Sequence, residues 1–344
     1  MRVMITGGAG LIGRALAAHL LERGFTVHLT DLVPETDTPH TSYVQCDITD
    51  FAAVRAQVRG CDAIVHLAAL RNPLYAPGPD VYRVNTVGTF NVFEAAALEG
   101  LHRVVQASSI NAIGCAWNIR DFEPQYFPID EDHPLATSDP YSLSKEQSET
   151  LGAYYWRRAE ITSVALRLPG IYAPEQRNAA YSERRTLMCQ FLDELISLPD
   201  AERERQLADV RARTLEARAA RALEYPATSW PVGETLDWAE LLWRAYMVDR
   251  FNLWASLDVR DAAVAIELAL TAAYTGSHPL FINDSQNSLG YESETLLRLF
   301  FPEVLTRRQP LIGAQALVSL QRAQDLLGFT PHYSRSGDQH AETR

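Results

Sequence analysis

A glycine-rich turn near the N-terminus, within the stretch Met4–Gly13 (MITGGAGLIG), constrains the fold more than any other part of the chain. The short apolar run in Arg2–Thr6 predicts a buried β-strand, and the apolar spacing after the turn predicts a helix. Residues without Cβ let the backbone bend sharply toward a pyrophosphate, and the helix N-terminus presents free N–H groups and a partial positive charge to that anion. This strand, turn and helix together predict a dinucleotide site rather than a purely structural turn, with contacts from Gly7, Gly10, Leu11, Ile12 and Gly13.

An acidic residue at the end of the next strand indicates which dinucleotide is bound. Thr26–Thr30 predicts this second strand, and Asp31 follows it, 18 positions after Gly13. A carboxylate there accepts hydrogen bonds from the adenosine ribose and repels the 2′-phosphate of NADP, which favours NAD. Farther on, Asp47 is positioned to accept from the adenine amino group, with Ile48 beside it.

A further buried strand is predicted for Cys61–Leu67. In an open parallel sheet the ligand lies outside the carboxyl ends of the strands, so we expect cofactor contacts from the residues that end and follow this one. His66 belongs to the apolar strand and is interpreted as a hydrogen-bonded core histidine. The contact residues predicted here are Leu67, Ala68, Ala69 and Arg71, of which Arg71 can reach a ribose, a phosphate or the substrate.

A tyrosine and a lysine four residues apart carry the predicted chemistry. Pro140 is well placed to begin a helix, and Tyr141 and Lys145 then lie on one face of it, one turn apart. Oxidation of an alcohol needs a base near neutral pH, and a nearby ammonium lowers the pKa of a phenol from about 10. Ser109, just after the predicted strand Arg103–Ala107, can hold the substrate oxygen.

Bulk properties exclude several classes of function. A net charge of −12 over 344 residues argues against a nucleic-acid partner, and no apolar run is long enough to span a membrane. The chain enters a strand directly, so we expect no signal peptide. The four cysteines are widely spaced, which predicts reduced thiols in a cytoplasmic protein and no metal site.

Taken together, these motifs resemble an extended short-chain dehydrogenase/reductase of the NAD-dependent sugar epimerase/dehydratase type. The resemblance covers nearly the whole chain but is thin between residues 176 and 250. The matching segments are Thr6–Gly13, Asp31, Cys46-Asp47, His66–Ala69, Asn85 with Gly88-Thr89, Ser108–Gly114, Tyr141 with Lys145, Leu166–Pro174, Leu257–Ala263 and Gln324–Phe329.

The resemblance implies residue roles and an assembly. It implies that Ser109, Tyr141 and Lys145 are the catalytic triad, and that Asn85 and Pro169 lie near the nicotinamide. It also implies a homodimer, formed by pairing the helices predicted for Asp80–Leu98 and Tyr141–Trp156 with those of a second subunit.

Departures from the family pattern bear on the substrate. Gly170 stands where nucleotide-sugar epimerases commonly have an asparagine that helps hold the substrate diphosphate. Ile110-Asn111 replaces the Asp-Glu pair of the 4,6-dehydratases, so water elimination lacks its acid and base. The absence of that asparagine favours a free sugar, a sugar acid or another non-nucleotide substrate, as in the uronate dehydrogenases of the family. The predicted substrate residues are Arg71, Ser109, Asn111 and Gly170.

The predicted fold class is α/β, a doubly wound parallel (Rossmann) sheet with a smaller, mainly helical substrate lobe. The NAD domain is residues 1–169, with 252–285 returning to it; the lobe is 170–251 with 286–333, and 334–344 is a polar tail. Within the lobe, helices are predicted for Arg185–Ile196 and Asp200–Leu223, and a strand for Asn252–Trp254 before the helix Leu257–Thr271. The clustered tryptophans Trp230, Trp238, Trp243 and Trp254 are interpreted as core residues rather than sugar-stacking ones.

The predicted function is an NAD-dependent oxidoreductase that removes a hydride from a carbinol of a sugar or sugar-derived substrate. It is a sugar dehydrogenase or an epimerase, and the sequence leaves that choice open. One alternative is a nucleotide-sugar 4-epimerase that retains its NAD. Another, from a different class, is a non-catalytic NAD-binding regulatory protein, against which the presence of all three catalytic side chains argues.

Overall fold

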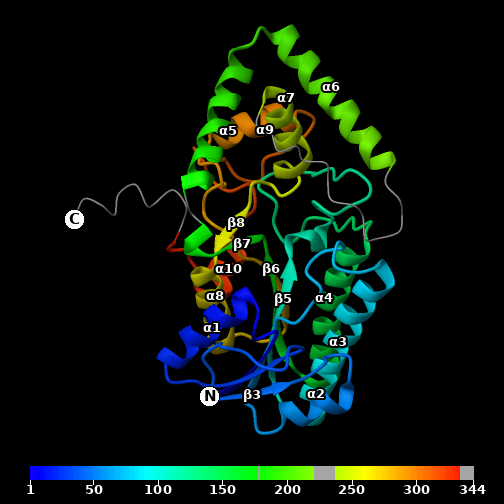
Figure 1. Ribbon diagram of the computed structural model, residues 1–344, viewed down its shortest axis with the longest axis vertical. Coiled ribbons are helices and arrows are strands. Elements are labelled where there is room, and N and C mark those ends of the chain that lie inside the picture. The colour runs from blue at the N-terminus through cyan, green and yellow to red at the C-terminus, as the bar shows by residue number, and fades with distance from the viewer. Residues whose placement is uncertain (177–178, 221–236, 334–344) are drawn as a thin grey trace, which may run out of the picture.

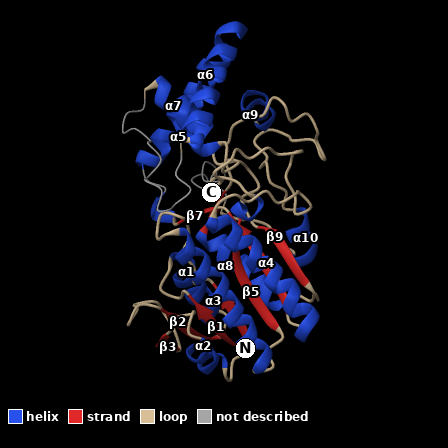
Figure 2. Cartoon of the chain, turned by 90° about the vertical axis from the view of Figure 1, so that its right-hand side faces the viewer, coloured by secondary structure: helices blue, strands red, loops and turns tan. Residues whose placement is uncertain are grey.

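The computed structural model describes residues 1–176, 179–220 and 237–333. Its centre is a seven-stranded, all-parallel sheet with the strand order β3-β2-β1-β4-β5-β6-β9 (Figures 1 and 2). The order reverses between β1 and β4, which opens a crevice at the carboxyl ends of these strands. The strands are β1 (Arg2–Thr6), β2 (Thr26–Asp31), β3 (Ser42–Gln45), β4 (Ala63–His66), β5 (Arg103–Ser109), β6 (Thr162–Leu168) and β9 (Ser277–Phe281).

Helices cover both faces of the sheet. One face carries α1 (Leu11–Glu22), α8 (Val259–Thr271) and α10 (Gln321–Leu327). The other carries α2 (Phe51–Val58), α3 (Gly78–Leu98) and α4 (Pro140–Ala159). Burial on both sides explains why the inner strands β1 and β4 are largely apolar instead of alternating with polar residues.

The side chains of β1 show how the sheet forms two cores. Val3 and Ile5 pack on the α1 and α8 side, whereas Met4 packs on the α2 and α3 side. All three are fully buried. Successive side chains of a strand point to opposite faces, so one apolar strand contributes to both cores.

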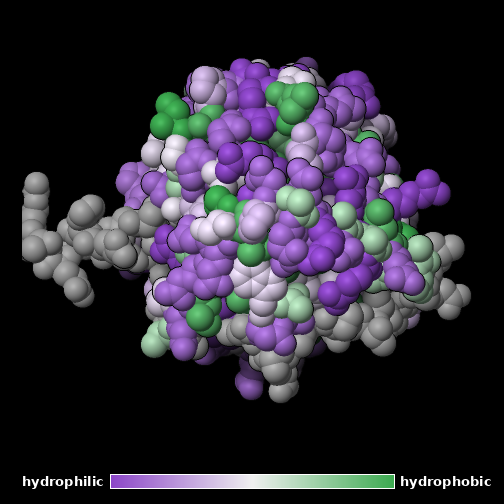
Figure 3. Space-filling model, turned by 90° about the horizontal axis from the view of Figure 1, so that it is seen from above, coloured by the Kyte–Doolittle hydropathy of each residue, from purple (hydrophilic) through white to green (hydrophobic). Residues whose placement is uncertain are grey.

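The lobe above the sheet has its own apolar core. Its main helices are α5 (Ala179–Ser197), α6 (Asp200–Ala219), α7 (Trp238–Arg244) and α9 (Ser293–Phe300). Seen from this end of the molecule, the surface is mainly hydrophilic, with hydrophobic residues in small separate patches (Figure 3). The shorter elements are the parallel pair β7 (Gly170–Tyr172) and β8 (Ser256–Asp258), the 3-10 turns Ile110–Ile113 and Pro174–Gln176, and the π-helical turn Ala245–Asp249.

One predicted strand is wrong. Residues 252–254 form a turn, in which Leu253 and Trp254 have positive φ values of 55° and 45°, and the strand β8 begins only at Ser256. The helix predicted from Leu257 begins at Val259, because the Asp258 carboxylate caps it by accepting from the Arg260 N–H.

The other predictions for the lobe agree with the structure where they lie within the described residues. Helices α5 and α6 lie where helices were predicted, although Leu223 falls outside the described residues. Trp243 and Trp254 are buried, which confirms them as core residues, and Trp238 packs against the same core. Trp230 and the polar tail 334–344 lie outside the described residues. Within the described part of the chain, no helix is long and apolar enough to cross a membrane.

Candidate active site

The glycine turn folds so tightly that side chains would collide with the backbone. A Cβ on Gly13 would lie 2.5 Å from the Gly7 carbonyl oxygen, and a Cβ on Gly7, whose φ is +70°, would lie 2.7 Å from the Ala68 nitrogen. Gly10 is the N-cap of α1 and supplies no side-chain cap. The N–H groups of Leu11, Ile12 and Gly13 have no carbonyl one turn earlier to bond, so they are available to an anion.

This turn forms one end of a cleft of about 980 Å³ at the carboxyl ends of the strands. The cleft runs from the glycine turn, past the ends of β2 and β4, to the end of β5 and the start of α4. It brings together most of the residues predicted for cofactor and chemistry: Gly7, Gly10, Leu11, Ile12, Gly13, Asp31, Asp47, Ile48, Leu67, Ala68, Ala69, Arg71, Ser109, Tyr141, Lys145 and Pro169.

Asp31 is held rigidly where a ribose would lie. Its Oδ2 accepts from the Ala9 N–H at 2.9 Å, and its Oδ1 accepts from the Leu32 N–H at 2.7 Å. The carboxylate therefore links the glycine turn to the end of β2. Asp47 is held by Thr49, whose N–H and hydroxyl both donate to its Oδ1 at 2.8 Å. The cradle, the free N–H groups and the fixed acid fit a dinucleotide.

The predicted catalytic residues converge at the other end of the cleft. Ser109 is the last residue of β5, and Tyr141 and Lys145 lie in the first two turns of α4. The start of α4 is fixed by Pro140 at its first position and by the N-cap Asp139, whose carboxylate accepts from the Ser142 N–H. Lys145 Nζ donates to the Ala107 carbonyl at 2.8 Å and lies 5.9 Å from the centre of the Tyr141 ring.

Burial shifts both titrating groups of this set. It raises the pKa of Tyr141 to about 12, although a hydrogen bond with Ser109 and the positive charge of Arg71 both act to lower it. Burial lowers the pKa of Lys145 to about 8, opposed by the Glu149 carboxylate. Ser109 and Arg71 lower the pKa of the phenol here, while Lys145 Nζ donates to the Ala107 carbonyl.

Lys145 has a further property that its motif does not reveal. It is the only lysine in the 344-residue sequence, since every other long basic side chain is an arginine. Its ammonium is buried with a lowered pKa, whereas a guanidinium stays protonated in proteins. The single lysine also gives a unique spectroscopic probe within the site.

Three predicted residues do not line the cleft. Asn85 is buried and braces the site: its amide accepts from the Leu70 N–H and donates to the Ser144 hydroxyl. Asn111 is also buried and donates to the Ser109 hydroxyl oxygen at 3.2 Å. Gly170 is exposed at the start of β7, and nothing lies within 4 Å of where its Cβ would be.

His66 is the core histidine that the sequence predicts. Its Nδ1 hydrogen-bonds the Thr6 hydroxyl at 2.7 Å, and its Nε2 hydrogen-bonds the Thr89 hydroxyl at 3.1 Å. Burial, reinforced by the nearby Lys145 charge, lowers its pKa to about 3. A histidine that stays neutral and has both nitrogens engaged cannot serve as the base.

Tyr75 and Arg83 are two of the polar cleft residues that the sequence did not predict. The Arg71 guanidinium donates to the Tyr75 hydroxyl at 2.6 Å and lies 5.5 Å from the centre of its ring. Arg71 and Tyr75 are four residues apart, a spacing that predicts contact between side chains only within a helix. These residues lie in a loop, so the spacing did not predict their contact.

Comparison with known proteins finds a matching family model and similar enzymes. A model of the NAD dependent epimerase/dehydratase family matches residues 3–211. The uronate dehydrogenase of Pseudomonas putida is 31% identical over 201 residues, and the match covers 57% of this chain and 69% of that enzyme.

Two solved structures share the fold over nearly the full chain. MoeE5 in complex with UDP-glucuronic acid and NAD has a TM-score of 0.60 at 22% identity, covering 97% of this chain and 95% of that one. Uronate dehydrogenase from Agrobacterium tumefaciens has a TM-score of 0.58 at 19% identity, covering 100% and 89%. The predicted doubly wound fold is confirmed.

Proposed function

Because this chain belongs to the NAD dependent epimerase/dehydratase family, we propose that it is a dehydrogenase that oxidises a carbinol of a sugar acid with NAD. The observation that carries this proposal is the cleft itself, which joins the dinucleotide cradle to Ser109, Tyr141 and Lys145. When bound, NAD supplies the hydride acceptor and a positive charge beside the phenol.

The protein's own residues have three roles in this proposal. Tyr141 takes the proton of the substrate hydroxyl, helped by the Ser109 hydrogen bond and the Arg71 charge, which favour the phenolate. Ser109 orients the substrate oxygen. Lys145 is close enough to the ring to keep a positive charge in the site, and its ammonium can bond the cofactor's ribose.

A sugar acid is favoured over a nucleotide sugar by the charges at the substrate end. Arg71 lines the cleft, and its positive charge acts on the Tyr141 phenol. A guanidinium binds a carboxylate with two parallel hydrogen bonds. Gly170 offers no side chain to a diphosphate. The uronate dehydrogenases among the similar proteins support the same class.

The test is absorbance at 340 nm with NAD and a panel of uronates, neutral sugars and nucleotide sugars. Accumulation of NADH with uronates supports the proposal. NADH from neutral sugars alone overturns the assigned substrate class. Conversion of a nucleotide sugar to its epimer without NADH indicates the 4-epimerase instead. Bound NAD with no turnover of any compound indicates a regulatory binding protein.

Asp31→Ala is expected to narrow the preference for NAD over NADP by at least about tenfold in kcat/KM, because the variant removes a carboxylate that repels the 2′-phosphate. Asp47→Ala is the matched control, since this acid lines the adenine end of the cleft, which both cofactors share. It should weaken both cofactors alike. An Asp31→Ala enzyme with the wild-type ratio would remove Asp31 from the ribose.

We also propose a homodimer formed through α3 and α4. Large apolar side chains lie exposed along these two packed helices, namely Tyr82, Val87, Phe90, Leu143 and Tyr154. A hollow of about 810 Å³ lined by Tyr82 and Leu143 adds to that face. Light scattering of the wild type should give twice the chain mass of 38.4 kDa. The Phe90→Arg variant should give the mass of a single chain. A monomeric wild type contradicts the pairing.

A cytoplasmic location completes the proposal. Cys46, Cys61, Cys115 and Cys189 are all free thiols, and burial raises the pKa of each. Unpaired, unreactive thiols suit a reducing compartment.

A further inference from the structure

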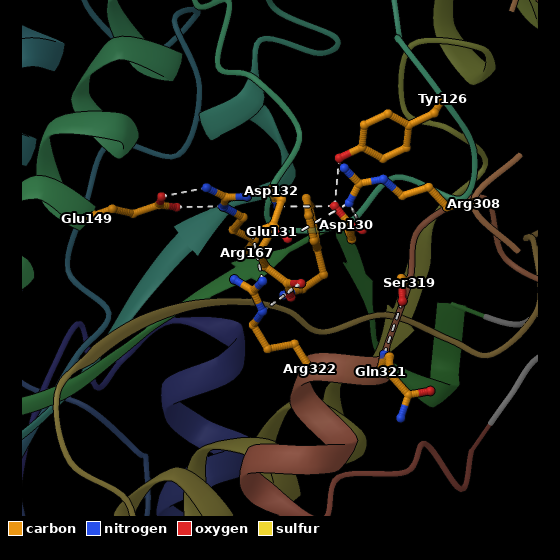
Figure 4. A network of polar contacts seen from close by, with 11 residues as sticks. Tyr126, Asp130, Glu131, Asp132, Glu149, Arg167, Arg308, Ser319, Gln321 and Arg322 are labelled. Atoms are coloured by element: carbon orange, nitrogen blue, oxygen red, sulfur yellow. Dashed lines mark hydrogen bonds and ion pairs between the residues drawn. The ribbon is translucent and has the colours of Figure 1, made fainter. Parts of the chain in front are cut away.

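A buried ion pair lies directly behind the catalytic residues. The Arg167 guanidinium donates from Nε to Glu149 Oε1 at 2.9 Å and from Nη2 to Oε2 at 2.8 Å (Figure 4). Only 2% of the Arg167 side chain and 9% of the Glu149 side chain are exposed. The pair is therefore bidentate and almost dry, which is the geometry in which such a pair is most directional.

The pair joins the three elements that carry the site. Glu149 lies on α4, one turn beyond Lys145, and Arg167 lies on β6, two residues before Pro169. Glu149 Oε1 also accepts from the Ser108 hydroxyl at 2.7 Å, and Ser108 stands opposite Arg167 in the β5–β6 register. The Ser108 backbone leads directly to the catalytic Ser109.

Arg167 is held from the far side as well. Its guanidinium lies 5.0 Å from the centre of the Phe281 ring on β9. The buried Glu131 accepts from the Phe281 N–H at 2.7 Å. Arg322 of α10 lies 3.7 Å from the same carboxylate (Figure 4). Burial raises the pKa of Glu131, and the charges of Arg322 and Arg167 oppose that rise. The arginine therefore has little freedom to leave Glu149.

The charge of Glu149 acts on Lys145. Burial of Lys145 disfavours its ammonium, and the Glu149 carboxylate favours it. The other titrating groups that face Lys145 are His66 from β4 and Tyr141 from its own helix. His66 is neutral because burial lowers its pKa to about 3, and a protonated Tyr141 carries no charge. Glu149 thus provides the compensating anion.

We propose that Glu149 and Arg167 act as a positioning pair for the catalytic residues: the pair fixes Ser109 and α4 relative to each other, Glu149 favours the charged form of Lys145, and Arg167 limits that effect by holding the carboxylate. This inference depends on the proposed function only for the roles of Ser109, Tyr141 and Lys145. Arg167 orients the carboxylate, and the carboxylate sets the charge of the lysine.

The single lysine allows a direct test that needs no substrate. Protein grown with lysine labelled with ¹³C at Cε gives one lysine signal, whose shift with pH reports the protonation of Lys145. Glu149→Gln keeps an acceptor for Ser108 but removes the charge, so the titration midpoint should fall by about one pH unit or more. Arg167→Met frees the carboxylate to act on Lys145, so the midpoint should rise.

Glu94→Gln is the matched control. Glu94 of α3 accepts from Arg158 and Tyr155 of α4, so it also joins an arginine to this helix, but it does not line the cleft. It should lower the melting temperature and leave the Lys145 midpoint unchanged. Midpoint shifts of the same sign in Glu149→Gln and Arg167→Met, or none in either, overturn the proposal and leave the pair a structural bridge.

A double variant covers the case in which Glu149→Gln fails to fold, because it does not leave a buried guanidinium unpaired. In Glu149→Gln with Arg167→Met two opposite charges are removed together, so the midpoint should lie below that of Arg167→Met alone; a midpoint equal to or above that of Arg167→Met contradicts the role of Glu149. Once a substrate is known, kcat of a folded variant should fall with the midpoint. A failed substrate panel with the expected midpoint shifts refutes the proposed function but not the pair.

Discussion

Tyr141→Phe is expected to lower the rate of sugar oxidation by about 10²- to 10⁴-fold and to leave the affinity for NAD nearly unchanged. The substitution removes only the hydroxyl that takes the substrate proton. The ring keeps its buried place in the first turn of α4, where the exposed fraction of the residue is 6%. Turnover is measured from NADH absorbance and NAD affinity by calorimetry.

Tyr154→Phe is the control for this change. Tyr154 lies on the same helix but is exposed and does not line the cleft, so its loss of a hydroxyl should leave turnover intact. The wild-type rate should also increase with pH above neutrality, because the phenol pKa of about 12 leaves little phenolate at pH 7. Phenylalanine should abolish that dependence. An active Tyr141→Phe enzyme would exclude Tyr141 as the base.

The sequence predicts the cofactor half of the molecule well because local rules govern it. The sharp turn from strand to helix requires a residue without a side chain at position 13. The position of Asp31 at the end of β2 is fixed by the length of the β1–α1–β2 unit. Tyr141 and Lys145 share a helix face by spacing alone. Such features depend on neighbours within a few turns of chain, and their signals survive in a single sequence.

Contacts between distant segments explain what the sequence did not predict. The run Asn252–Trp254 has the composition of a strand, yet Trp254 packs against Phe300 in the core of the lobe and the backbone turns there. In the sequence, Glu149 lies in a charged helical segment, where a solvent-exposed glutamate is expected. Its buried ion pair with Arg167 forms only because the fold packs α4 against β6.

The roles of the two asparagines are a different case. An amide near a cleft can bind a ligand or can satisfy backbone groups, and both roles require the same residue type. Asn85 holds the loop after β4, and Asn111 holds Ser109. Sequence alone cannot separate these roles.

Gly13→Ala is expected to weaken NAD binding by about 100-fold or more and to destabilise the fold by roughly 1–3 kcal/mol. The added Cβ would lie 2.5 Å from the Gly7 carbonyl oxygen and 2.7 Å from that of Gly8. Both neighbours are backbone atoms of the turn, so neither can swing aside as a side chain would. The turn must open, and its N–H groups then no longer converge on the pyrophosphate.

Gly10→Ala separates the two effects. Its Cβ would meet only the Gly7 carbonyl oxygen, at 3.3 Å, and its φ of −75° suits any residue. Alanine there should therefore weaken NAD binding by occupying the approach of the pyrophosphate, with little change in melting temperature. Gly24→Ala, at a positive φ of 79° far from the cleft, should cost stability and leave NAD affinity unchanged. If Gly13→Ala binds NAD as the wild type does, the pyrophosphate does not lie on this turn, and the cleft must hold its ligand elsewhere.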